Sequence, residues 1–391
     1  MEPDKRYKIW FFPRWYPDRD DSMFGLFIRR HAEAVQLKHD VFVLYTTPSD
    51  RCNNTYELTE NKHDGITEIT CYYKKSESSI INLFRYIAGT NKIYNQCIKK
   101  HGSPDINHIH VLTRTGIFPL ILKACKRIPY VITEHWSRYL PENVKSGSYN
   151  GWLRKFFTKL IVQYSSGITT VTKNLSSAMI SAGLKHSNYT TIPNVADADL
   201  FHPPKAAVEN HKKKFVHISC FDEKAKNVKG IIDTIELLLA ERQDFQMEII
   251  GDGPDFMEVN NYAQSSNIST EQLYFSGLLE GEQLASRLRN ADAFVMFSNY
   301  ENLPCTICES LISGVPVISS DVGGISEFVG TNEGILVKKQ NTSELRDAMN
   351  AILKGEKTFD RSSIRNYGIE NFGKESISNQ FHSLYKIALW S

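Results

Sequence analysis

Short apolar segments alternate with longer amphipathic segments along most of the chain, which is the pattern of parallel α/β layers. In the first half, the apolar run YKIWFF (7–12) precedes a turn-rich loop, and an amphipathic stretch at 25–39 leads to DVFVLYTT (40–47). This order predicts one strand–helix–strand unit. Further strands of the same sheet are predicted within DINHIHVL (105–112), PYVITEH (129–135) and SGITTVT (166–172).

The second half repeats the alternation after a polar, proline-containing stretch. Two adjacent prolines, Pro203 and Pro204, and a basic run precede the apolar segment KFVHIS (214–219). Such a stretch is typical of a linker, which we place near residues 194–204. Later strands are predicted within FQMEIIGDG (245–253), QLYFSG (272–277), DAFVMF (292–297), VPVISS (315–320) and GILV (334–337).

The alternation predicts an α/β protein of two doubly wound, Rossmann-like domains in tandem. We assign residues 1–195 to the first domain and 196–370 to the second. Residues 371–391 are expected to form a C-terminal helix that packs back on the first domain. Ligands of open α/β sheets bind at the carboxyl ends of the strands. Candidate site residues are therefore sought in the segments that follow the predicted strands.

Composition narrows the class of protein. A length of 391 residues fits two or three domains, and 46 basic against 44 acidic residues give a net charge of +2. This balance argues against a nucleic-acid partner. Seven scattered cysteines, an odd number, indicate free thiols in a reducing compartment. We see neither a signal peptide nor a run of the ~18–20 apolar residues that span a bilayer, so we expect a cytosolic protein.

The segment SNYENLPCTICES (298–310) follows a predicted strand and carries candidate chemistry. We expect Pro304 in the first turn of a helix, with the amides of Cys305 and Thr306 facing the strand ends. A helix start of this kind favours an anion such as a diphosphate.

Two carboxylates accompany this helix start, Glu301 before it and Glu309 further along it. Both can accept hydrogen bonds from hydroxyl groups. A diphosphate carrying a polyol at each end, as in a nucleotide sugar, would satisfy the helix start and both acids. The alternative is a structural helix with one acid near its cap and one on its surface.

With SGVPVISSDVGGISE (313–327), these two glutamates resemble the donor-binding segment of the retaining glycosyltransferases of family 4. The remaining motifs stand in the matching order: Gly25, TEH (133–135), IPN (192–194), KN (226–227), GDGP (251–254) and FSG (275–277). The resemblance implies a GT-B fold, in which an acceptor-side domain and a donor-binding domain face a central cleft. It also implies that neither a metal nor another cofactor is needed.

The resemblance implies roles for individual residues. Glu309 would bind the ribose hydroxyls and Glu301 a hydroxyl of the transferred sugar. Lys226 would stabilise charge on the departing diphosphate, and His135 would reach the donor sugar from the first domain. Glu301, His135 and Lys226 are thus the predicted catalytic residues. The other predicted donor-binding residues are Gly25, Lys224, Gly251, Gly277, Leu278, Leu303, Cys305 and Thr306.

The chain departs from the family pattern at one place. The family commonly has Gly-Arg shortly before the phosphate-binding lysine, whereas this chain has Ile218-Ser219-Cys220-Phe221. Lys224 would replace the arginine, or Lys226 would act alone with the helix start. An ammonium group cannot copy a bidentate guanidinium, so the phosphate contacts are the part of the resemblance that this departure affects most.

Three other patterns have weaker links to chemistry. His108 and His110 share one face of a predicted strand and are interpreted as structural or acceptor-side, because a metal would need further ligands. The pair Cys305 and Cys308 has no second pair to complete a zinc site. An Asp-x-Asp at 197–199 lies in the predicted linker and is not expected to bind metal.

The acceptor side leaves more alternatives open. The segment GWLRKFFTKLIVQY (151–164) mixes basic and aromatic residues without an acid. It is either a helix that contacts an anionic membrane surface at the inner face of the cytoplasmic membrane, or a core-packed helix with basic residues facing solvent. The loop 13–25 and residues 114–116 are further candidate acceptor contacts.

The predicted function is retaining transfer of a sugar from a UDP- or GDP-linked donor. The acceptor would be a glycan or a lipid-linked molecule in cell-surface polysaccharide biosynthesis. One alternative is another GT-B enzyme, such as a nucleotide-sugar epimerase. A second is a non-catalytic nucleotide-sugar binding protein, which the missing Gly-Arg would favour.

Overall fold

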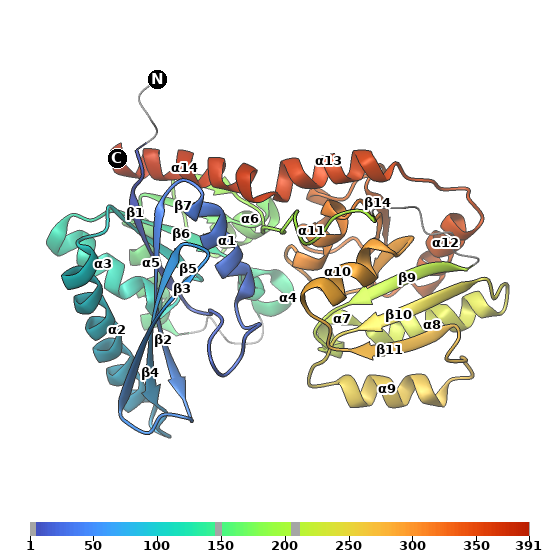
Figure 1. Ribbon diagram of the computed structural model, residues 1–391, viewed down its shortest axis with the longest axis horizontal. Helices are drawn as coiled ribbons and strands as arrows, with labels where there is room; N and C mark the ends of the chain where they lie inside the picture. Colours follow the sequence, from blue (N-terminus) through green and yellow to red (C-terminus); the bar gives the residue numbers. More distant parts are fainter. Residues whose placement is uncertain (1–4, 145–150, 205–211, 391) are drawn as a thin grey trace. The chain divides into compact units, whose positions relative to one another are not determined.

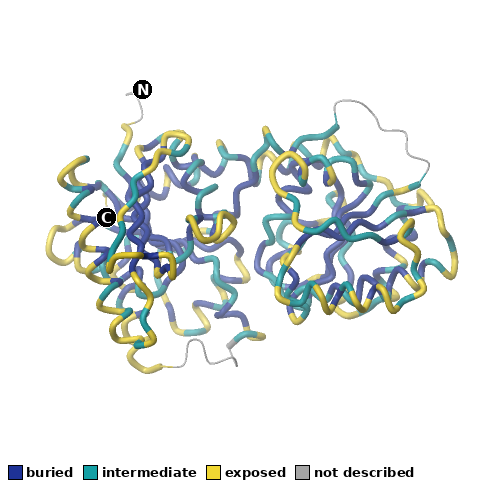
Figure 2. Tube along the Cα trace, turned by 60° about the horizontal axis from the view of Figure 1, so that its bottom comes forward, coloured by how far each residue is buried: buried dark blue, intermediate teal, exposed yellow. Residues whose placement is uncertain are grey.

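The computed structural model describes residues 5–144, 151–204 and 212–390 and divides into two compact units. The first unit contains the chain up to Val171, then Leu175–Pro193 and the segment from Lys374 onward. The second unit contains Thr172–Asn174 and Asn194–Gly373. In both units, buried strands lie inside and exposed positions gather on helices and loops (Figure 2).

The first unit is built on one sheet with the strand order β3-β4-β2-β1-β5-β6-β7-β8 (Figure 1). All neighbouring strands except β3 and β4 are parallel. The strands are β1 (Lys8–Pro13), β2 (Asp40–Ser49), β3 (Tyr56–His63), β4 (Ile66–Lys74), β5 (Ile106–His110), β6 (Tyr130–Glu134), β7 (Gly167–Thr170) and β8 (Tyr189–Thr191). Because successive connections run in opposite directions from β1, the strand order reverses between β1 and β5.

The helices of the first unit follow the predicted alternation. They are α1 (Leu26–Gln36), α2 (Ser79–His101), α3 (Ile117–Lys126), α4 (Pro141–Val144), α5 (Trp152–Gln163), α6 (Lys173–Ser181), whose first two residues belong to the second unit, and α14 (Lys374–Trp390). Short 3-10 turns follow β5 and β6, at Arg114–Gly116 (η1) and Ser137–Tyr139 (η2).

The second unit has the strand order β11-β10-β9-β12-β13-β14, and every pair is parallel. Its elements are β9 (Lys213–Ile218), α7 (Glu223–Lys226), α8 (Val228–Leu239), β10 (Phe245–Ile250), α9 (Phe256–Ser265), β11 (Leu273–Gly277), α10 (Gly281–Arg289), β12 (Ala293–Met296), α11 (Cys305–Ile312), β13 (Val317–Ser320), η3 (Ile325–Glu327), β14 (Gly334–Val337), α12 (Thr342–Leu353) and α13 (Arg361–Phe372). This is the Rossmann order, with its reversal between β9 and β12.

Helix α14 contacts α1, β5 and β6 within the first unit. Its buried stripe, which includes Ile377, Phe381 and Tyr385, repeats at helical spacing. Each such side chain contributes about 1.5–3 kcal/mol when it leaves water. The phenolic oxygen of Tyr385 also lies 2.7 Å from Nδ1 of the buried His108.

The hairpin of β3 and β4 departs from the predicted parallel layers, because these two strands are antiparallel. Their turn is Asp64-Gly65, with φ of 45° and 82°. Asp-Gly is the residue pair that a two-residue hairpin turn with positive φ favours, so the sequence carried a signal for this element. The following helix α2, which has 23 residues and Ser78 as its N-cap, was not predicted either.

The interpretation of residues 151–164 as a core-packed helix is wrong for the first half of α5. Trp152 is 77% exposed, and Leu153, Phe156 and Phe157 are also exposed. The buried side chains of α5, Thr158, Ile161 and Val162, lie near the end of the helix.

Candidate functional site in the second unit and the histidine cluster of the first

The carboxyl ends of β9 and β12 bring Lys226 and Glu301 together, although the two residues are 75 positions apart. Lys226 ends the short helix α7, which follows β9. Its Nζ donates to Oε1 of Glu301 at 2.5 Å. The same oxygen accepts a hydrogen bond of 2.9 Å from Oγ of Ser298, which follows β12. Two predicted catalytic residues therefore meet at the strand-order reversal of the second sheet, where ligands of such sheets bind.

The ion pair is largely shielded from water, since the Lys226 side chain is 20% exposed and that of Glu301 is 11% exposed. Burial alone would lower the pKa of Lys226, but the attraction of Glu301 outweighs it and raises this pKa above its ordinary value. The ammonium group is therefore charged at neutral pH, next to a carboxylate that it holds in place.

Helix α11 begins one residue later than expected. Pro304 is the N-cap with an extended backbone (φ −61°, ψ 132°), and Cys305 is the first helical residue. The carbonyl of Pro304 accepts from the amide of Ile307 at 3.1 Å. The buried Leu303 precedes this cap, and its carbonyl accepts from Nδ2 of Asn194 at 2.7 Å. Pro304 thus ends the preceding loop rather than occupying the first helical turn.

Glu309 lies inside α11 and is only 4% exposed. The alternative that made it a surface acid is therefore wrong. A buried carboxylate is costly unless its charge is compensated by hydrogen bonds or a cation. Its burial at this position leaves the predicted role in nucleotide binding open.

Gly251, after β10, and Gly277, at the end of β11, shape the same edge of the sheet. Gly251 has φ of 140°, and its amide donates to the carbonyl of Gly277 at 2.9 Å. Gly277 has φ of 67° with open space where a Cβ would stand, and the following Leu278 is exposed. Lys224 is also exposed and forms no ion pair among the described residues. These predicted donor-binding residues lie at or just after the strand ends, and the replacement of the missing arginine by Lys224 stays a prediction.

We expect Gly251→Ala to destabilise the second unit by about 3–5 kcal/mol. A Cβ there would stand 1.9 Å from the carbonyl oxygen of Ser219, on a backbone that L residues rarely adopt. Gly355→Ala is the matched control, because Gly355 has φ of 71° but no atom within 4 Å of the added Cβ. Urea unfolding of both variants measures the difference. Equal losses would show that the close approach to Ser219 is unimportant.

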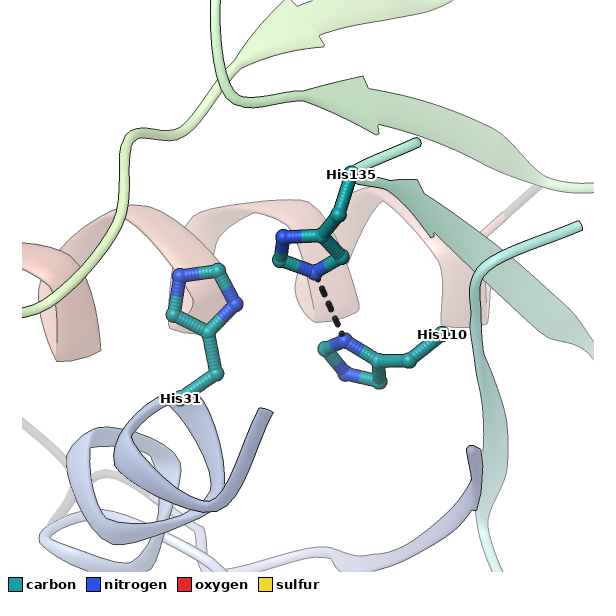
Figure 3. Close-up of side chains that lie close together, drawn as sticks. All are labelled: His31, His110 and His135. Atoms are coloured by element: carbon teal, nitrogen blue, oxygen red, sulfur yellow. Dashed lines mark hydrogen bonds between the residues drawn. The ribbon is translucent and has the colours of Figure 1, made fainter. Parts of the chain in front are cut away.

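The first unit places His135 in a cluster of three histidines, drawn in Figure 3. His135 directly follows β6, His110 ends β5 and His31 lies on α1. Nε2 of His135 and Nδ1 of His110 are 3.2 Å apart, and His31 Nε2 lies 2.9 Å from the carbonyl of Pro193. Because a carbonyl only accepts, His31 carries its proton on Nε2 and turns the lone pair of Nδ1 toward the other two rings (Figure 3).

His31 and His110 are neutral at physiological pH. Burial lowers the pKa of His31 to about 4, and burial together with the neighbouring histidines lowers that of His110 well below its usual value. Each of the three rings offers a nitrogen within 4.8 Å of the others, which makes this one of two described groups able to present three metal-binding atoms; the second is Glu33, His63 and Asp64. His108 is not part of it, since its nitrogens contact Tyr385 and Thr133.

The lowered histidine pKa values predict a stability change below neutral pH. The pKa of His217, buried in the second unit, is also lowered to about 4 by burial. The unfolded chain therefore binds more protons between about pH 6.5 and 4, so this stabilisation is present at neutral pH and is lost as pH falls through that window. From pH 7 to pH 5, each such histidine should remove about 2 kcal/mol. Urea titrations at both pH values measure the free energy of unfolding. Its fall from pH 7 to pH 5 should be smaller by this amount in His217→Gln than in the native protein, and an equal fall would contradict the prediction.

Two family models match adjacent parts of the chain. The model "Glycosyltransferase Family 4" matches residues 28–200, and "Glycosyl transferases group 1" matches residues 201–370. The chain belongs to the family-4 glycosyltransferases. The family resemblance is therefore confirmed, and so is the GT-B fold of this family-4 protein, because solved GT-B structures match it over almost its whole length.

Solved structures similar to this family-4 glycosyltransferase include a sucrose-phosphate synthase from Thermosynechococcus elongatus, with a TM-score of 0.74 and 18% identity over 97% of this chain and 98% of that one. Anabaena HepE in complex with UDP and glucose gives a TM-score of 0.71 and 15% identity over 98% and 100% of the two chains.

Curated relatives are also distant in sequence. The N-acetyl-alpha-D-glucosaminyl L-malate synthase of Bacillus anthracis is 23% identical over 72% of this chain and 74% of its own length. TuaC of Bacillus subtilis is 24% identical over 63% of this chain, and the match spans 60% of TuaC. Among the described residues of the family-4 protein, no helix has both the length and the apolar character to cross a membrane.

Proposed function

We propose that this family-4 protein is a retaining glycosyltransferase that needs no metal. It would move a sugar from a UDP- or GDP-linked donor to a glycan or lipid-linked acceptor in cell-surface polysaccharide biosynthesis. The observation that carries this proposal is the shielded ion pair of Lys226 and Glu301 at the strand-order reversal of the second sheet.

In the proposed reaction, the bond between the anomeric carbon and the diphosphate oxygen breaks, and a bond to the acceptor hydroxyl oxygen forms on the same face. The hydroxyl proton passes to the departing phosphate oxygen. Negative charge grows on the diphosphate as it leaves, and the fixed ammonium of Lys226 stabilises it. Since both described contacts of the Glu301 carboxylate use Oε1, its Oε2 is left to accept from a sugar hydroxyl.

Relatives support the reaction class and leave the sugar open. They include an N-acetyl-alpha-D-glucosaminyl L-malate synthase from Bacillus anthracis and an alpha-(1->4)-mannosyltransferase from Mycolicibacterium hassiacum. HepE was solved with UDP-glucose as well as with UDP. The relatives differ in the sugar that their names give, and the UDP and UDP-glucose bound to HepE carry the diphosphate that Lys226 would contact.

Thermal unfolding with UDP, GDP, ADP and their common sugar conjugates tests the proposal. A nucleotide at ~100 times its Kd should stabilise the protein by about 2.7 kcal/mol. Nucleotide release from the matching sugar conjugate should then depend on added acceptor, and the product should keep the donor's anomeric configuration. Binding without acceptor-dependent release would favour a non-catalytic protein. Absence of stabilisation by every compound would contradict the proposed site.

A further inference from the structure

The first sheet also has a strand-order reversal, between β1 and β5, and a cavity of about 470 Å³ lies beyond the carboxyl ends of these strands. Arginines contribute four of its lining residues, and none of the described residues that line it is acidic. The lining is Arg14, Leu83, Leu112, Thr113, Arg114, Ile117, Trp136, Arg138, Arg154, Phe157, Thr158 and Ile161.

Arg14 and Arg114 both line this arginine cavity. Neither has an acidic partner among the described residues. The guanidinium of Arg114 lies over the ring of Tyr86 at 4.1 Å and donates to the hydroxyl of Tyr73 at 3.4 Å. Burial, followed by the positive charge of Arg114, lowers the pKa of Arg14. Two guanidinium groups that repel each other in a partly buried site would gain from an anion between them.

The third cavity arginine is held rigidly. Arg138 is buried, lies 4.7 Å from the rings of Trp136 and Tyr139, and donates to the carbonyl of Leu112. The nearby carboxylate of Glu134 does not line the cavity, and three backbone amides, those of Leu112, His135 and Trp136, already donate to it. Glu134 interacts electrostatically with Arg138, but Arg14 and Arg114 have no such acidic neighbour among the described lining residues.

Exposed apolar side chains adjoin this charge on two helices. On α2 they are Ile80, Ile81, Leu83, Phe84 and Ile87, and on α5 they are Trp152, Leu153, Phe156 and Phe157. Leu83 and Phe157 belong to both sets, because they also line the cavity. Apolar surface of this kind usually marks an interaction site. Cationic cavity and apolar surface are thus continuous.

We propose that the arginine cavity binds the phosphate or diphosphate of a lipid-linked acceptor, whose hydrocarbon chain lies on the exposed apolar residues of α2 and α5. This inference rests on the proposed function and specifies its acceptor. A guanidinium group can donate two parallel hydrogen bonds to two oxygens of a phosphate. The cavity offers several guanidinium groups, and no acid is among its described lining residues. A neutral glycan acceptor without a lipid would not use the charge, and an anionic glycan would not use the exposed apolar surface.

Calorimetry with farnesyl diphosphate, farnesol and inorganic diphosphate tests this inference. A saturating concentration of the nucleoside diphosphate that stabilises the protein is present throughout, so that the probes cannot bind at the donor site. Farnesyl diphosphate should bind at least ten times more tightly than either fragment. The double variant Arg14→Gln/Arg114→Gln should weaken it at least tenfold, while Arg127→Gln, an exposed arginine after α3, should leave it unchanged.

Equal affinities for farnesyl diphosphate and inorganic diphosphate would show that the hydrocarbon chain is not bound. Equal affinities for farnesyl diphosphate and farnesol would show that the arginines do not bind the diphosphate. Because Arg14 and Arg114 are partly buried, Phe84→Ser provides a second test at a side chain that is 67% exposed. This variant should weaken the binding of farnesyl diphosphate but not that of inorganic diphosphate. If the protein binds phosphatidylglycerol vesicles as tightly as farnesyl diphosphate, and both variants lower the two affinities equally, the cavity binds the headgroups of bilayer lipids instead. Nucleotide stabilisation, measured on the same samples, separates failure of this inference from failure of the proposed function.

Discussion

Lys226→Met is expected to lower kcat for sugar transfer about 100- to 1000-fold, with a smaller effect on KM. The reason is that Nζ of Lys226 is fixed against Glu301 before the substrate arrives, so its charge needs no reorganisation as the diphosphate leaves. Methionine keeps the length of the side chain and removes the charge. Acceptor-dependent nucleotide release measures the loss.

Lys229→Met is the matched control. Lys229 also forms an ion pair of 2.5 Å, with the exposed Glu258, and lies only three residues from Lys226. Removing Lys226 leaves the shielded Glu301 without its cation, so unfolding must be measured in parallel to separate stability from rate. If Lys226→Met keeps its rate within threefold of the control, Lys226 does not stabilise the leaving group.

Glu309→Gln should weaken nucleotide binding at least tenfold, equivalent to about 1.4 kcal/mol. Glutamine preserves the shape of this buried side chain but loses the charge that would attract two ribose hydroxyl protons. The measured quantity is the nucleotide-induced rise in Tm, relative to the variant's own melting temperature without ligand.

Glu356→Gln, in an exposed loop of the same unit, is the control for this charge change. A variant whose Tm falls but whose nucleotide-induced rise matches that of the control would assign Glu309 a structural role. The prediction for nucleotide binding would then be wrong.

The alternating pattern predicted most of the fold because parallel strands are buried on both faces and stand out as apolar runs. It failed at β3, whose residues are mainly partly exposed and polar, so that the strand has no apolar run. The helix α2 was missed for a related reason, since its exposed Ile80 and Phe84 obscure the buried stripe.

The candidate site was predicted in part. Motif order gave Lys226 and Glu301, but only the fold shows that their side chains meet. The arginine cavity was indicated by Arg114 and the loop 13–25 as acceptor contacts, yet Arg138 was missed because nothing in its neighbourhood distinguishes it from a surface arginine. Sequence periodicity also gives no information on whether another element covers an apolar helix face, which is why the exposure of α5 required the structure.

The assignment of α14 to the first unit has a consequence for synthesis. The ribosome completes residues 1–193 and then the whole of the second unit before it releases the helix that contributes Phe381 and Tyr385 to the first core. Until then His108 lacks its Tyr385 partner, and the apolar surface that receives α14 is open to water. The first unit therefore finishes folding only after the second unit has been synthesised, and its core depends on the 17 residues of α14.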